Sequence, residues 1–62
     1  MPRARIVAAY EECEEAARRI VPGGFLLIED CRLCAELAAE ECGVSFDEAR
    51  AVLIEHWVMP AN

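Results

Sequence analysis

The chain has 62 residues, of which twelve are acidic and six are basic, and all six basic residues are arginines. The net charge of −6 disfavours a general phosphate-binding surface and docking on anionic lipid, because both depend on clustered positive charge. A chain of this length is expected to form one domain, residues 1–62, and to bury only about 60% of the surface that its unfolded form exposes.

The first element expected in the chain is a helix over residues 3–21. Apolar side chains recur there at spacings of three or four residues, which places them on one face of a helix. The opposite face carries two i,i+4 pairs with the acid on the N-terminal side, the more stabilising order, namely Glu14–Arg18 and Glu15–Arg19. A Pro-Gly-Gly sequence follows and is expected to end this helix, because proline cannot continue it.

The second element is predicted as a helix over residues 25–42, since its second half is rich in alanine and therefore strongly helical. Its first four residues, 25–28, are all apolar and could instead be extended. In that alternative, the acidic residues Glu29 and Asp30 would mark the start of the helix. Gly43 is expected to end the helix in the left-handed conformation that glycine adopts readily.

The third helix has the clearest start in the sequence. Ser45 is a favourable N-cap residue, and Glu48 lies three residues further on, which is the capping-box pattern. Pro60 is expected to end this helix. The apolar stripe expected to face the core consists of Phe46, Ala49, Leu53 and Trp57. The sequence therefore predicts an all-α fold, a small three-helix domain.

The second and third helices are expected to be arranged like a helix-turn-helix. The segment 36–45 resembles the middle of that motif, because small Ala39 lets two helices approach closely and Gly43 makes the turn between them. Recognition of DNA bases requires arginine, lysine, asparagine or glutamine on the third helix, and Arg50 is the strong candidate there. A DNA-binding transcriptional regulator that uses Arg50 is therefore an alternative function, although the acidic surroundings favour a helix-turn-helix shape that only packs.

The cysteines could form a metal site. Cys13, Cys31, Cys34 and Cys42 have the spacing C-x17-C-x2-C-x7-C, and four sulfurs could hold zinc or an iron–sulfur cluster. This order of cysteines resembles that of the WhiB-like iron–sulfur regulators of actinobacteria. The sequence departs from that family in two ways: the last spacing is longer, and both the tryptophan-bearing glycine turn and the basic tail are absent. On one continuous helix, Cys31 and Cys42 would be about 16 Å apart along the axis, so a shared site requires a break near Cys34.

Packing is the favoured interpretation of the cysteines, because a free cysteine behaves as a small hydrophobic residue. No cofactor is then expected. A Cys13–Cys34 disulfide is a further alternative that requires an oxidising compartment. Neither a secretory signal nor an apolar run of about 20 residues is visible. The expected location is the cytoplasm, where thiols stay reduced.

An enzyme is not expected. His56 is the sole histidine, and no nucleophile–base pair or phosphate-binding loop can be recognised around it or elsewhere. Some apolar side chains lie outside the predicted core stripes, and exposed apolar rows bordered by acids mark contact sites. The apolar candidates for partner binding are Leu33, Leu37, Ile54 and Val58. The acidic candidates are Glu36, Glu40, Asp47 and Glu48.

These features predict a small acidic protein–protein interaction module. It would dock on a basic surface of a larger protein partner, as an accessory or inhibitor protein. Small accessory or inhibitor proteins of phages and mobile elements often have this size and charge. The same apolar candidates could also support a homodimer.

Overall fold

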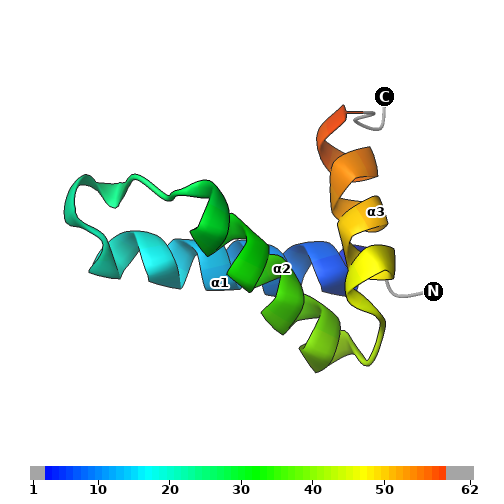
Figure 1. The fold of residues 1–62 in the computed structure, drawn as a ribbon. Coiled ribbons are helices and arrows are strands. Elements are labelled where there is room, and N and C mark those ends of the chain that lie inside the picture. Colours follow the sequence, from blue (N-terminus) through cyan, green and yellow to red (C-terminus); the bar gives the residue numbers. More distant parts are fainter. Residues whose placement is uncertain (1–2, 59–62) are drawn as a thin grey trace.

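The computed structural model describes residues 3–58. The chain forms, in order, α1 (Arg3–Ile20), a short 3-10 turn (Pro22–Gly24), α2 (Ile28–Cys42) and α3 (Phe46–Val58). Helix α2 runs back along α1, and α3 stands steeply across them beside the start of α1 (Figure 1). No strand occurs among the described residues, which confirms the predicted all-α domain of three helices. None of these helices has the length and apolar character that crossing a membrane requires.

Helix α1 agrees with its predicted range to within one residue, since it ends at Ile20 rather than at residue 21. Both predicted i,i+4 pairs form on its surface, with N–O distances of 3.4 Å for Arg18–Glu14 and 2.8 Å for Arg19–Glu15. The following two glycines have φ values of 77° and 72°, in the left-handed region that side chains rarely adopt. The Pro-Gly-Gly sequence therefore ends the helix as expected.

Helix α2 begins later than the main prediction, and the helical assignment of residues 25–27 was wrong. Those residues are extended, and the helix starts at Ile28. The physical reason is a cap: the Leu27 backbone N–H donates to Asp30 Oδ2 at 3.0 Å, and this carboxylate also lies at the positive end of the helix. The alternative prediction, an extended stretch before Glu29 and Asp30, is correct to within one residue.

The turn between α2 and α3 is fixed by hydrogen bonds at both helix ends. Gly43 has φ 71°, as predicted, and its N–H donates to Glu40 O at 3.2 Å. The Val44 N–H donates to Ala39 O at 3.0 Å, which completes a Schellman motif. At the start of α3, the Glu48 N–H donates to Ser45 Oγ at 3.1 Å, as expected for the predicted N-cap. The direction of α3 is therefore set locally.

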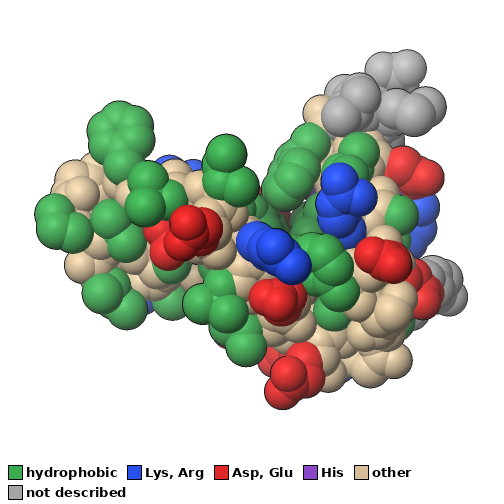
Figure 2. All heavy atoms as spheres, in the orientation of Figure 1, with side chains coloured by type: hydrophobic (Ala, Val, Ile, Leu, Met, Phe, Trp, Pro, Cys, Tyr) green, Lys and Arg blue, Asp and Glu red, His purple; other side chains and the backbone are tan. Residues whose placement is uncertain are grey.

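The core lies where the three helices meet. Alanine supplies much of it, so α2 can approach both neighbours closely, and Ile6 and Leu53 are its largest fully buried side chains. The other buried members, from all three helices, are Tyr10, Cys34, Ala35, Ala38, Ala39, Ala49 and Val52. Because alanine buries little area, much apolar surface remains outside, and Figure 2 shows hydrophobic side chains exposed on one broad face.

Trp57 does not lie in the core, which corrects the predicted apolar stripe of α3. Ala49 and Leu53 are buried and Phe46 is half-buried, but the Trp57 side chain is 55% exposed. The reason is the steep angle of α3, whose C-terminal half rises away from α2 (Figure 1). Trp57 instead meets the Tyr10 ring edge-on, with centroids 5.3 Å apart. The expected helix end at Pro60 lies outside the described residues.

Replacing Leu53 with alanine is expected to lower the free energy of unfolding by roughly 2–4 kcal/mol, because it leaves a cavity in a core with few large side chains. Leu33→Ala, on the exposed side of α2, should change it by less than about 0.5 kcal/mol. Urea unfolding followed by circular dichroism measures both values. Equal losses in the two variants would contradict this description of the core.

Candidate functional site

The cysteines lie mostly at the α1–α2 contact. Cys34 is buried beside Cys13, and Cys13, Cys31 and Cys42 are half-buried. Cys13 and Cys42 pack against the core. All four cysteines lie within the described residues and are free thiols. Their surroundings are those of small apolar side chains.

The arrangement does not form a metal site that uses all four sulfurs. Helix α2 is continuous from Ile28, so Cys31 and Cys42 lie about 16 Å apart along one axis. The break near Cys34 that a shared site would need does not occur. Within residues 3–58, no group of three or more histidine, cysteine, aspartate or glutamate side chains is placed to hold a metal ion.

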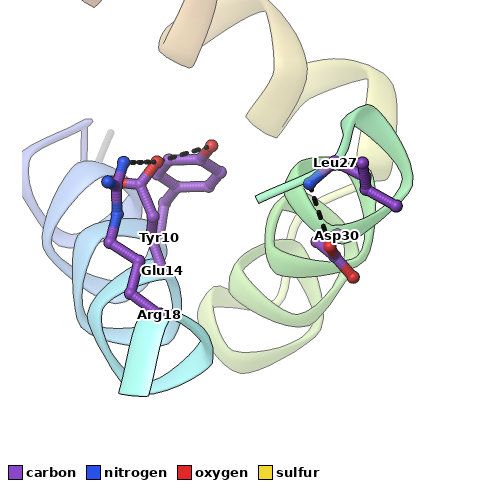
Figure 3. A network of polar contacts seen from close by, with 5 residues as sticks. All are labelled: Tyr10, Glu14, Arg18, Leu27 and Asp30. Atoms are coloured by element: carbon purple, nitrogen blue, oxygen red, sulfur yellow. Dashed lines mark hydrogen bonds and ion pairs between the residues drawn. The ribbon is translucent and has the colours of Figure 1, made fainter. Parts of the chain in front are cut away.

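Tyr10, Glu14 and Arg18 form a polar network on α1 (Figure 3). The Tyr10 hydroxyl donates to Glu14 Oε2 at 3.4 Å, and Glu14 also pairs with Arg18. Burial, followed by a hydrogen bond with Cys31, raises the pKa of Tyr10. Burial, followed by the contact with Cys13, raises the pKa of Cys34 to about 12. Both groups therefore stay protonated at neutral pH, and Cys34 offers no reactive thiolate.

Four of the predicted partner-binding residues share the outer side of α2, and we call this surface the acidic face. Leu33 and Leu37 are 54% and 46% exposed and lie one turn apart. Glu36 and Glu40 are also exposed and lie on the same side of the helix. A shallow cleft between α1 and α2 continues this surface, and its polar lining consists of Glu12, Glu40 and Glu41.

The other predicted residues lie elsewhere. Asp47 is exposed and Glu48 half-buried in the first turn of α3, where both suit the helix N-terminus. Ile54 is exposed and lines the cleft between α2 and α3. Val58 belongs to α3, but its side chain is outside what the structure describes. The predicted set is therefore divided between two surfaces and a helix start.

The second surface is an open cleft of about 350 Å³ between α2 and α3, here called the groove. Its floor includes Tyr10, and its basic residues are Arg32 and Arg50. The Arg32 guanidinium lies over the Phe46 ring, 5.7 Å from the centroid, in a cation–π contact. Its walls are apolar and include Ile28, Ala35, Leu53, Ile54 and Trp57. Figure 2 shows the hydrophobic and basic side chains that surround this cleft.

Sequence reasoning missed the groove because helical periodicity assigned Phe46 and Trp57 to a closed core. The sequence signal that could have revealed the groove is the position of two arginines, Arg32 and Arg50. Each lies next to apolar residues, on the sides of α2 and α3 that face each other. Arg50 was the candidate DNA contact of the alternative function, and the structure places it in the groove. The solvent side of α3 instead carries Asp47, Ala51 and Glu55, which offers no positive surface to phosphates.

No family model matches the chain, and the comparisons with curated proteins and with solved structures also found no match. The acidic face and the groove are therefore the observations on which a functional assignment rests.

Stability is expected to fall as the pH rises above about 9. The folded protein raises the pKa of Cys34 from its ordinary value of 9.0 to about 12. Between these two pH values the unfolded chain binds fewer protons than the folded protein, so a rising pH favours unfolding. The raised pKa of Tyr10 acts in the same direction. Urea unfolding at pH ~8 and pH ~10.5 measures the loss. The variant Cys34→Ala lacks the titrating thiol, so its stability should fall less over this pH range. An equal fall in the variant and the parent protein would contradict the assignment of the effect to Cys34.

Proposed function

We propose that the protein is an acidic protein–protein interaction module that binds a basic surface of a larger partner, as an accessory or inhibitor protein. The observation that carries this proposal is the acidic face, where two exposed leucines, Leu33 and Leu37, lie among the exposed carboxylates of Glu36 and Glu40. Covering the exposed half of a leucine side chain stabilises a complex by roughly 1 kcal/mol, and the carboxylates select a partner with positive charge beside its apolar contact.

The charge of the whole molecule supports a basic partner. The net charge is −6, and further carboxylates, Glu12 and Glu41, line the cleft that adjoins the acidic face. A field of one sign accelerates the encounter with a surface of the opposite sign. Binding of this kind weakens as salt screens the charges.

Helix α2 presents the acidic face on a rigid support. Its start is fixed by the Asp30 cap (Figure 3), and its end by the Schellman motif at Gly43. Its inner side packs on α1 and α3 through Cys34, Ala38 and Ala39. A surface that is already ordered loses little conformational entropy on binding, which favours affinity from a small contact.

The proposal places the protein in the cytoplasm. The four cysteines are free, and Cys34 is a buried thiol that packs as an apolar side chain. Such thiols persist in a reducing compartment, where disulfides are rare.

The variant Glu40→Arg should weaken binding of a basic amphipathic helical peptide, with leucines on one side and lysines and arginines beside them, by roughly tenfold. The reversal replaces an attraction with a repulsion next to Leu37, and tenfold corresponds to about 1.4 kcal/mol. Isothermal titration calorimetry measures the affinity.

Glu11→Arg is the matched control, because it makes the same change of net charge on α1, in the cleft that faces α3. Its affinity should stay within about twofold of the parent protein, since exposed charges distant from a contact act weakly. Equal losses for Glu40→Arg and Glu11→Arg would show that net charge alone attracts the peptide, and the acidic face would then not be the binding site.

A further inference from the structure

The acidic face leaves most of the exposed apolar surface without a role. The connection between α1 and α2 and the first residue of α2 expose large side chains to an unusual degree, 83% for Phe25 and 88% for Ile28, and Ile20 and Leu27 are also exposed. Figure 2 shows hydrophobic side chains on one face, from this connection to the cleft between α2 and α3. Many large apolar side chains exposed on one face mark an interaction site.

The groove at the other end of this surface combines apolar walls with two arginines. Neither Arg32 nor Arg50 forms an ion pair with another residue of the described range 3–58, whereas Arg3, Arg18 and Arg19 each pair with a glutamate. An occupant that complements the groove therefore carries apolar side chains next to a carboxylate.

The connection has that composition. Phe25 and Leu27 are exposed on extended backbone, and the exposed carboxylate of Glu29 follows after Ile28. We propose that the protein forms a two-fold symmetric homodimer in which the Phe25–Ile28 segment of each copy lies in the groove of the other. Glu29 of each copy then faces Arg50 of its partner copy.

The position of Ile28 makes a two-fold arrangement possible. Ile28, the first residue of α2, directly follows the exposed connection and also lines the groove, so the two complementary surfaces adjoin on one face. A two-fold axis near Ile28 brings each connection onto the opposite groove, which forms both contacts at once and leaves no open end. A standard interface covers about 800 Å² per partner, which is about one sixth of the total surface of 4711 Å².

Each copy has a net charge of −6, so two copies repel at long range, and the burial of apolar side chains must supply the attraction. The ion pairs between Glu29 and Arg50 set the register of the two chains rather than the strength of the contact. The groove residues of α2 lie on another side of the helix from the acidic face, whereas Glu29 lies four residues before Leu33 on the side of the acidic face. The two contacts are tested separately, because Glu40→Arg changes the acidic face and Arg50→Glu changes the groove.

Sedimentation equilibrium of the full chain at micromolar concentrations tests the proposal, and a mass twice that of one chain is expected. Glu29→Arg alone and Arg50→Glu alone should each raise the dissociation constant by at least about tenfold, because each places like charges opposite each other. The double variant exchanges the two charges and should return the constant to within about threefold of the parent value. Circular dichroism verifies that each variant keeps its helices.

Glu11→Arg again serves as the matched control, because it changes the net charge as Glu29→Arg does and should keep the dimer. A monomer at every concentration, or a dimer that the single reversals do not weaken, would overturn the proposal. Failure of the double variant to restore association would also overturn it.

Trp57 provides a second measurement, since it is the sole tryptophan and its side chain is 55% exposed in one copy. In the dimer the Phe25–Ile28 segment of the partner copy covers it, so its fluorescence emission should shift to longer wavelength on dilution. Emission that is independent of concentration across the mass transition would place the interface elsewhere and contradict the proposal.

Discussion

The Schellman motif at Gly43 determines which surfaces this protein has. Its left-handed backbone and the two hydrogen bonds beside it set the direction in which α3 leaves α2. Because that direction is steep, the base of α3 packs into the core through Ala49, whereas its C-terminal half stands away from α2. The space between them is the groove, and the outer side of α2 remains free as the acidic face.

Local signals in the sequence predicted the elements well. The Pro-Gly-Gly sequence, Gly43 and the Ser45 cap each act within a few residues, so they place helix ends without knowledge of the tertiary structure. The start of α2 was harder, because an apolar run such as residues 25–28 suits helix and extended backbone alike. There the outcome depends on a single side chain, Asp30, which caps the helix at Leu27.

The candidate site was predicted only in part, for a geometric reason. Leu33, Glu36, Leu37 and Glu40 could be grouped because they lie on one helix, where spacing alone determines the shared side. The groove depends on the angle between two helices, and helical periodicity holds no information on that angle. Trp57 shows the difference: its spacing along α3 is that of a core residue, but its side chain is 55% exposed and meets the Tyr10 ring edge-on.

The contact between Tyr10 and Trp57 also has a consequence for the order of folding. These rings meet across 47 positions of the chain, the difference between their residue numbers, whereas α2, its turn and α3 are consecutive in sequence. Contacts between nearby residues form faster, because shorter loops must close. The α1–α2 and α2–α3 pairs, each joined by a short connection, are therefore expected to form before α1 and α3 meet.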